Sequence, residues 1–574
     1  MKIRKNILLI FPLVPSLLYF YLSSFEKKLY VTTGIFIFLI LINRNFIDQE
    51  KIQEKISNSR SQNYMYLIMF IFLIYTQNKY LNLETITWDV SSYLVASNEI
   101  NQGFIPLETQ WESKGPLTIY IYYLISLLVN SNYIFFKLIN DLILFLTIVI
   151  FSKNIKQYDF KKGKIYFYAS FLLISIFSIR WFISEYTEFY CLPLIAYANY
   201  LYVEDTKTKE KYIGLLFAIS FLINQGSVLL FFPILIHTIL KNQHTSVIIK
   251  TFFKYFLGFI IPNILFLIIY WEKGLLRTYL ANFFDIPLGY IGERASSFYE
   301  LRVFLREISG INIFLYFTII SIFIFFIMNF FSQKDFKISS ILDLINLNVV
   351  FSLLYYFIAG HNFYHHFIYF LYFSLFLIIK VNQGFQKDLI YFLVFISCIN
   401  SVIISSPNSF KNLSAISETY ENYPLKKLSI EIDNEFENKN YTILALDFVL
   451  VLHYLDKTNY SYIVHPTNHY QDYITDVLVD LGRIEENHVY KSISEKPDVI
   501  ICNSKSIDAG GNVFSTDPEN YGQEIIENKR GICDFNNFSN DYKQIDSSEY
   551  RTDPNLNYYY DPYKEMNIFI KINN

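Results

Sequence analysis

The stretch from residue 85 to residue 117 concentrates groups that could do chemistry. It carries four carboxylates and one lysine, at positions Asp89, Glu99, Glu108, Glu112 and Lys114. A carboxylate can accept a proton from a hydroxyl group, and an ammonium can bind a phosphate as a point charge. Long apolar segments flank the stretch, and charged groups in such a setting are retained mostly where they serve a function. This stretch is therefore the first candidate for an active site.

The composition predicts that the stretch belongs to a polytopic membrane protein. The 574 residues are 53% hydrophobic and 17% charged, whereas soluble domains are about a quarter charged. The first apolar segment follows a basic N-terminus but lacks a small-residue cleavage site, so we expect an uncleaved span. The net charge of −3 gives no indication of nucleic-acid binding.

Thirteen apolar segments are expected to cross the membrane as α-helices, with ends placed to within a few residues. They lie near residues 7–22, 29–42, 64–77, 133–152, 165–182, 186–203, 212–224, 227–240, 250–271, 308–331, 338–358, 366–380 and 388–404.

The basic residues predict the orientation of these spans. Alternate connections, beginning with the N-terminus, hold 22 Lys and Arg residues, and the opposite connections before the tail hold about 10. This bias predicts a cytoplasmic N-terminus. The loops 78–132, 272–306 and 359–367 then share the outer face with the tail, 405–574.

The chain divides into three predicted regions: an N-terminal helical hairpin with a cytoplasmic linker (1–63), the main transmembrane module (64–404) and an extracytoplasmic α/β domain (405–574). In the tail, an apolar run at 441–452 predicts a strand entering a helix. Short β-branched runs at 460–467, 496–503 and 567–572 predict further strands. A disulfide between Cys502 and Cys533 is compatible with an oxidising compartment, but the sequence does not fix their distance.

The first outer loop, 78–132, is expected to contain two short helices. Residues 91–101 have near-helical apolar spacing, and Gly103 and Pro106 follow as stop signals. The apolar run 117–129 has 13 residues, which is short for a span, so we expect a helix along the membrane surface.

The order of these elements resembles the GT-C superfamily of membrane glycosyltransferases, in particular bacterial relatives of the protein O-mannosyltransferases and the lipid A aminoarabinose transferase. The similar text is "WDVSSYLVASNEINQGFIPL" followed by "ESKGPL". "SEYTEFYCLPLIAYANYL" (184–201), "LINQGSVLLFFPIL" (222–235) and "AGHNFYHHFIYFLYF" (359–373) also match, although Asn224 stands where the family usually has Lys and His366 where it has Tyr. The resemblance covers most of 64–404.

The resemblance implies transfer of a sugar from a polyprenyl-phosphate donor to a hydroxyl of a lipid, glycan or protein acceptor on the outer face. It also implies a location in the inner membrane of a bacterium. Asp89 is the candidate general base, with inversion at the sugar carbon, and desolvation is expected to raise its pKa. Capping of a helix is the alternative role for Asp89. Lys114 is the candidate phosphate ligand, with Arg294 or Arg302 assisting, and the alternative for Lys114 is an interfacial anchor.

The other candidate residues have two interpretations each. Glu112 could orient Lys114, contact the sugar or bind a divalent cation, or it could be a solvated acid. His361, His365 and His366 are expected to contact phosphate or sugar, or to pack as polar residues. Adjacent residues diverge on a helix, so no metal site is expected there, and no cofactor is certain.

Glu188 is expected either to bind sugar hydroxyls or to pair with Arg180. Trp88 could stack on a sugar ring, although most aromatic residues belong to bilayer packing and the interfacial belt.

Other functions predict different sequence features. A flippase or transporter predicts charges within spans and inverted repeats, whereas the charges of this chain cluster in outer loops. An O-antigen polymerase or ligase predicts a large loop between late spans rather than a tail after the last one. A sensor would leave the charged first loop unexplained.

Overall fold

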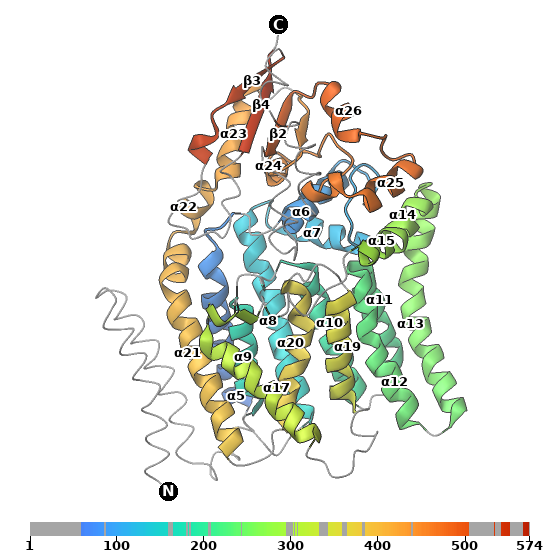
Figure 1. The fold of residues 1–574 in the computed structure, drawn as a ribbon, viewed down its shortest axis with the longest axis vertical. Coiled ribbons are helices and arrows are strands. Elements are labelled where there is room, and N and C mark those ends of the chain that lie inside the picture. Colours follow the sequence, from blue (N-terminus) through green and yellow to red (C-terminus); the bar gives the residue numbers. More distant parts are fainter. Residues whose placement is uncertain are drawn as a thin grey trace.

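The computed structural model places a helical bundle beneath a mixed β-sheet (Figure 1). It describes residues 59–84, 88–158, 165–179, 182, 185–204, 208–242, 244–293, 302, 305–306, 308–310, 312–331, 343–358, 364–380, 385–437, 440–503, 533, 541–550 and 566–572. The expected spans at 7–22 and 29–42 lie outside these described residues.

The bundle helices coincide with the remaining apolar segments that the sequence analysis identified. They are α5 (Ser59–Gln77), α8 (Tyr133–Tyr158), α9 (Ile165–Phe177), α10 (Thr187–Val203), α11 (Lys209–Ile223), α12 (Phe232–Lys241), α13 (Thr245–Glu272), α17 (Ile313–Phe331), α19 (Leu344–Ile358), α20 (Ile368–Ser374) and α21 (Phe385–Ser414). The 3₁₀ helix η4 (Gln225–Phe231) leads into α12, and η5 (Tyr364–Phe367) and η6 (Leu375–Lys380) flank α20.

Length and composition support a helical membrane protein. Among the described residues, three helices are long and apolar enough to cross a membrane: Tyr133–Tyr158, Thr245–Glu272 and Ile390–Ser414, and six shorter apolar helices accompany them. Side chains such as Phe253 and Leu265 on α13 are more than half exposed, as expected of a helix that faces lipid. The number of thirteen crossings stays a prediction.

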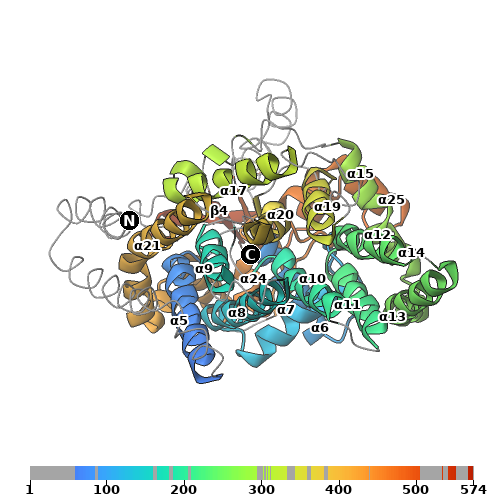
Figure 2. The ribbon, with the colours of Figure 1, turned by 90° about the horizontal axis from the view of Figure 1, so that it is seen from below.

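Close helix contacts hold the bundle together. Seen from below, α10 and α20 lie near the centre, with α17 and α21 on one side and α11 and α13 on another (Figure 2). A Cβ on Gly214 of α11 would collide with the carbonyl of Tyr255, and one on Gly258 of α13 would collide with the carbonyl of Lys211. Small residues at such crossings let helix backbones approach, which favours van der Waals packing where hydrophobic exclusion is absent.

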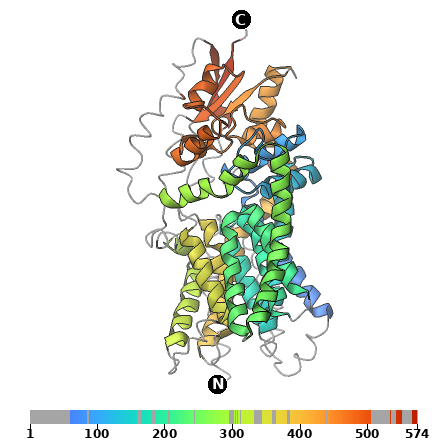
Figure 3. The same ribbon diagram turned by 90° about the vertical axis from the view of Figure 1, so that its right-hand side faces the viewer.

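A layer of short helices separates the bundle from the sheet (Figures 1 and 3). It contains α6 (Trp88–Asn101), α7 (Pro116–Leu128), α14 (Leu276–Phe283) and α15 (Asp285–Glu293). Gly103 follows α6 with a φ of 87°, and Asn130 and Ser131 adopt positive φ between α7 and α8. The structure therefore confirms two short helices in the first outer loop, whereas contact of α7 with a membrane surface stays a prediction.

The tail contains a four-stranded sheet in the order β1-β2-β4-β3. Its strands are β1 (Ile443–Ala445), β2 (Val499–Asn503), β3 (Tyr542–Ile545) and β4 (Met566–Lys571). β1 and β2 pair in parallel, and β4 runs antiparallel to β2 and β3. The accompanying helices are α22 (Ile416–Glu421), α23 (Pro424–Glu435), α24 (Leu450–Tyr454), α25 (Asp472–Asp480) and α26 (His488–Ser494).

The helix α24 connects this sheet to the layer of short helices. It follows β1 within the apolar run 441–452, as that run predicts, and it packs against α6. The expected strand at 460–467 is wrong. Ile463 forms only an isolated parallel bridge with Trp111, and the 3₁₀ helix η7 (Pro466–Tyr470) follows at once because Pro466 cannot donate to a ladder. The extracytoplasmic placement of the tail stays a prediction.

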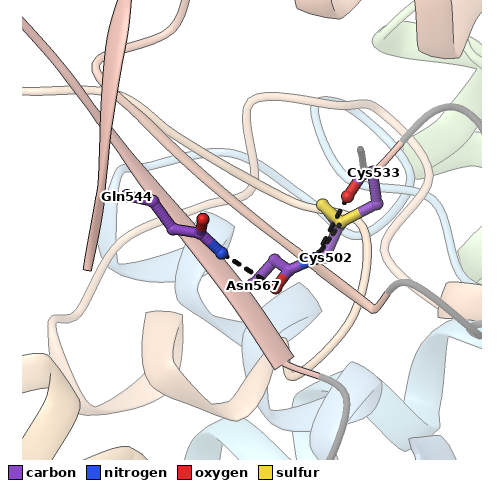
Figure 4. The surroundings of a disulfide bond; sticks show 4 residues. All are labelled: Cys502, Cys533, Gln544 and Asn567. Atoms are coloured by element: carbon purple, nitrogen blue, oxygen red, sulfur yellow. Dashed lines mark hydrogen bonds between the residues drawn. A yellow bond between two sulfur atoms is a disulfide. The ribbon is translucent and has the colours of Figure 1, made fainter. Parts of the chain in front are cut away.

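A disulfide joins Cys502 at the end of β2 to Cys533 (Figure 4), with 6.0 Å between the two Cα atoms. Asn567 of β4 donates through Nδ2 to the carbonyl of Cys533 at 3.1 Å, and Gln544 of β3 donates to Asn567 at 3.1 Å. The bridge that the sequence left open is thus present, and it fastens Cys533 to β2, an inner strand of the sheet.

Candidate active site

Asp89 lies in the first turn of α6 and faces the tail rather than the bundle alone. Its Oδ1 is 3.3 Å from Nε2 of His465, and a third of the Asp89 side chain remains exposed. The N-terminal end of a helix also favours a negative charge at this position. A carboxylate from the first outer loop and an imidazole from the tail therefore meet at one point.

The surroundings of His465 fix which ring nitrogen carries a proton. The backbone N–H of Thr467 donates to Nδ1 at 3.3 Å, and the Thr467 hydroxyl lies 3.0 Å from the same nitrogen. An accepting Nδ1 places the proton of a neutral imidazole on Nε2. His465 can then donate to Asp89 without carrying a positive charge.

The direction of the Asp89 pKa corrects the expectation from sequence. Burial by itself raises the pKa of Asp89, but the hydrogen bond and charge of His465, together with His365 and Lys114, outweigh burial and hold it well below its ordinary value. Burial lowers the pKa of His465, but the hydrogen bond and charge of Asp89 outweigh burial and raise it overall. Asp89 is therefore ionised at neutral pH. The partner that causes this comes from a segment more than 370 residues away in the sequence.

The segment that follows α6 is folded around the buried carboxylate of Glu99. This carboxylate accepts hydrogen bonds from the backbone N–H groups of Leu107, Thr109 and Gln110 at 2.8–3.1 Å, and from the Thr109 hydroxyl at 3.0 Å. Burial raises the pKa of Glu99 to about 7 despite these bonds. A carboxyl group with four donors acts as the organising centre of a loop that has no regular structure of its own.

Polar contacts then attach this loop to the tail. Trp111 exchanges backbone hydrogen bonds with Tyr462 at 2.6 Å and Val464 at 3.3 Å. The side-chain amide of Gln110 donates through Nε2 to the carbonyl of Asn459 at 3.0 Å. The backbone N–H of Asn459 donates to Oε1 of Gln110 at 2.8 Å. These contacts hold the chain just before His465 against the chain that leads to Lys114.

Glu112 and Lys114 continue from this attached loop toward the bundle. Glu112 is buried and accepts from the backbone N–H and the hydroxyl of Ser113 at 2.7 and 2.9 Å. Burial raises the pKa of Glu112, against the opposing charge of His465. The Lys114 carbonyl accepts from Asn282 of α14 at 3.0 Å. Glu112 is therefore no solvated loop acid but part of the buried charge cluster.

The backbone after Lys114 packs directly on the bundle. A Cβ on Gly115 would collide with the carbonyl of Leu222 in α11, so only glycine permits this approach. The backbone N–H of Gly115 donates to the carbonyl of Ile223 at 3.2 Å, and the Thr118 hydroxyl donates to the same carbonyl at 2.8 Å. Pro116 then starts α7. The position of Lys114 is thus set by a backbone contact with α11.

On the bundle side, Glu188 in the first turn of α10 faces the two adjacent histidines of η5. Nε2 of His365 is 3.9 Å from Glu188 Oε2, and Nε2 of His366 is 3.6 Å from Glu188 Oε1. Asn224 donates to Glu188 Oε1 at 2.9 Å. Lys114 lies close enough to attract the Glu188 carboxylate electrostatically.

The expectation that the two histidines diverge is wrong. They lie on a 3₁₀ turn, with ring centroids 4.5 Å apart and planes at 74°, and both reach the same carboxylate. The charge of His365 also acts on Asp89. The structure therefore brings together Asp89, Lys114, Glu188 and this histidine pair.

Five candidates from the sequence are not placed in this cluster. Arg294 and His361 lie outside the described residues, as does Arg180, the alternative partner of Glu188. Arg302 is helical and exposed. Trp88 is half-buried at the start of α6, where its carbonyl accepts from Ser92. Its contact with a sugar stays a prediction.

Sequence reasoning missed His465. The sequence "YSYIVHPTNHY" suggested a strand, although a His-Pro pair after a β-branched run marks the end of such a run. Nothing in the sequence connects that position to Asp89, because the contact depends on how the tail folds back.

Solved structures of the enzyme ArnT from Cupriavidus metallidurans have a similar fold. The structure bound to undecaprenyl phosphate has a TM-score of 0.54 and 8% identity, and the match covers 78% of this chain and 94% of that one. The apo structure has a TM-score of 0.52 and 9% identity, over 77% and 93% of the two chains. No family model and no curated protein sequence matches the chain. The likeness shows that the chain has a fold similar to that of ArnT, as the resemblance of the sequence motifs predicted.

Proposed function

We propose that the protein is a glycosyltransferase that moves a sugar from a polyprenyl-phosphate-linked donor to an acceptor hydroxyl on the outer face of the membrane. The contact between Asp89 and His465 carries the proposal, because it keeps Asp89 ionised while part of its side chain stays exposed. Lys114 and Glu112 are near enough to interact with Asp89 electrostatically, which supports the proposal. The fold is that of a protein solved with undecaprenyl phosphate bound, which supports a lipid-phosphate donor. The Cys502–Cys533 bridge supports an oxidising, extracytoplasmic location for the tail.

In the proposed reaction the acceptor oxygen attacks the anomeric carbon while the bond from that carbon to the phosphate oxygen breaks. The polyprenyl phosphate leaves with the electron pair of that bond, and a single displacement inverts the sugar carbon. Lys114 stabilises the phosphate as its negative charge increases. A direct phosphate contact by Arg294, His365 or His366 stays a prediction.

Asp89 takes the proton of the acceptor hydroxyl. A carboxylate whose pKa is depressed is a weak base toward a neutral hydroxyl, but it stays ionised and can orient that hydroxyl as a hydrogen-bond acceptor. The proton becomes acidic once the new bond to an electron-poor sugar carbon forms, so it transfers late. His465 keeps Asp89 ionised and oriented until that moment.

The binding step can be tested with undecaprenyl phosphate alone. The purified full-length protein is expected to bind this lipid, measured by native mass spectrometry, and Lys114→Ala is expected to weaken binding. Lys273→Ala is the matched control, because Lys273 pairs with Glu108 at the surface, 3.4 Å away, and not with the cluster. Equal binding by wild type and Lys114→Ala would remove the phosphate role of Lys114.

The transfer step needs a panel of polyprenyl-phosphate sugars and the Asp89→Asn variant. We expect the wild type to release polyprenyl phosphate from one donor in the presence of acceptor, and Asp89→Asn to be slower by about 10²–10⁴-fold, the usual contribution of a general base. A folded Asp89→Asn variant that transfers at the wild-type rate would refute the base assignment.

A further inference from the structure

We propose that Glu188, His365 and His366 form a binding site for one divalent transition-metal ion of the zinc class. The three side chains come from the start of α10 and from η5, which are far apart in the sequence. Their ligand atoms all lie within 4.8 Å of one another, and all three residues are buried. Metal binding itself is independent of the proposed glycosyl transfer, although its use in catalysis would rest on that function.

The distances fit a shared ion after a small movement. Each carboxylate oxygen of Glu188 faces one imidazole, at 3.9 Å for His365 and 3.6 Å for His366. Ligands bound at about 2.0–2.2 Å in a tetrahedral site stand roughly 3.3–3.5 Å apart. The two measured separations, which run to different oxygens of Glu188, exceed this by a few tenths of an ångström. The ligand atoms as a set lie within 4.8 Å of one another, so the three side chains would move closer together to share one ion.

The charges of the cluster also favour a cation. A buried carboxylate between two buried imidazoles is a negative charge out of water, and such a charge requires a positive partner. Lys114 supplies one from the outer loop. A divalent ion between the three ligands would neutralise the carboxylate directly and leave Lys114 available for a second anion.

The neighbouring residues hold the ligands in the orientation that a metal site needs. Asn224 donates to Glu188 Oε1 at 2.9 Å, and the Thr187 hydroxyl donates to Oε2 at 3.1 Å. The Tyr186 ring stacks on His365 with centroids 4.2 Å apart, and Tyr355 contacts His366 edge to face. Such outer contacts orient ligating side chains and raise metal affinity.

The ligand types select the ion. Two imidazole nitrogens and one carboxylate suit zinc and its neighbours, whereas calcium and magnesium prefer oxygen ligands. Three protein ligands leave at least one coordination position open. A phosphate oxygen of a lipid carrier could occupy that position beside Lys114, which gives the site a role in the proposed reaction.

The test uses zinc alone with the full-length purified protein. The protein is prepared without a metal-affinity tag, treated with a chelator, dialysed and titrated with Zn²⁺, and bound metal is measured by plasma mass spectrometry. We expect about one zinc ion per chain for the wild type. Glu188→Gln and His366→Gln are expected to weaken zinc binding by at least tenfold, whereas His244→Gln, at an exposed histidine, is expected to bind like the wild type.

A second measurement keeps the proposal testable if a variant folds poorly. Zinc is expected to raise the melting temperature of the wild type and of His244→Gln, but not of Glu188→Gln. No zinc binding by the wild type at micromolar concentration, or equal binding by wild type and Glu188→Gln, would overturn the proposal. Zinc binding without sugar transfer would leave the metal site standing and refute the proposed function instead.

Discussion

Removing the His465 side chain tests whether the tail takes part in the reaction. In His465→Ala, Asp89 loses a hydrogen-bond donor at 3.3 Å. Two full charges at that distance would interact by about 5 kcal/mol at an effective dielectric of 20, an upper limit. Hydrogen bonds to charged groups contribute about 1.5–3 kcal/mol. Because a third of the Asp89 side chain is exposed, we take the lower end, about 1.5–2 kcal/mol.

This energy predicts a fall in kcat/KM of about 10- to 30-fold. The pH dependence gives a second, more specific readout. Burial raises the pKa of Asp89, and the hydrogen bond and charge of His465 lower it. Without His465 the pKa of Asp89 is therefore expected to rise toward that of an ordinary carboxyl group. Activity depends on the ionised form, so the acid limb of the pH–rate profile is expected to move to higher pH.

The assay measures release of polyprenyl phosphate across pH for four proteins. His465→Gln keeps an N–H donor but cannot become charged, so it separates hydrogen bonding from charge. His488→Ala is the matched control, because His488 contacts His469 in the same domain and not Asp89. If His465→Ala retains the wild-type rate and acid limb, His465 has no influence on Asp89 and the reasoning fails.

Asp89 and His465 each contribute to the free energy of unfolding, and the two contributions change with pH in opposite directions. The depressed pKa of Asp89 contributes stability above the unfolded carboxyl value, and this contribution is lost as pH falls. The raised pKa of His465 contributes stability below the unfolded imidazole value, and this contribution is lost as pH rises through the folded value. The contact is therefore strongest in between.

Three further changes test other parts of the structure. Lys114→Ala is expected to raise the KM for the lipid donor by about tenfold or more, measured in steady-state kinetics, because a charged contact to phosphate is lost. Glu99→Ala should lower the free energy of unfolding by about 2–4 kcal/mol in urea titrations, because three backbone donors lose their partner. Cys502→Ser should destabilise the tail by about 3–4 kcal/mol, since the bridge closes a loop with a separation of 31 residues. Thermal unfolding of the wild type, with and without reductant, and of the variant measures this effect. Equal melting temperatures for the wild type and Cys502→Ser would contradict it.

Local patterns predicted much of the bundle and of the first outer loop. The apolar runs mark the helices from α5 to α21 because helix formation in lipid depends on length and hydrophobicity. Gly103 marks the end of α6 because its backbone preference acts within a few residues. α21 continues to Ser414, ten residues beyond the expected end at 404, since a polar helix can extend past an apolar one without any change in the hydrophobic signal.

Which side chains lie next to one another in the candidate site was harder to predict. Asp89 could be selected as an ionisable residue in an unusual setting, but the direction of its pKa depends on His465, which no local pattern connects to it. His365 and His366 looked divergent because helical geometry was assumed, and a 3₁₀ turn instead directs both toward Glu188. Long-range pairing of loops is a property of the tertiary fold, and a single sequence contains no direct record of it.

The attachment of the first loop to the tail has a consequence for biosynthesis. Gln110 bonds to Asn459, 349 residues later, and Asn98 bonds to the carbonyl of Leu452, 354 residues later. At ribosomal rates of about 5–20 residues per second, the loop must wait roughly 20–70 s for its partners. During that time the bundle can insert while Asp89 has no His465 beside it. A chain whose synthesis stops after the last bundle helix would therefore lack the Asp89–His465 contact, and under the proposed function it would be inactive until the tail is made.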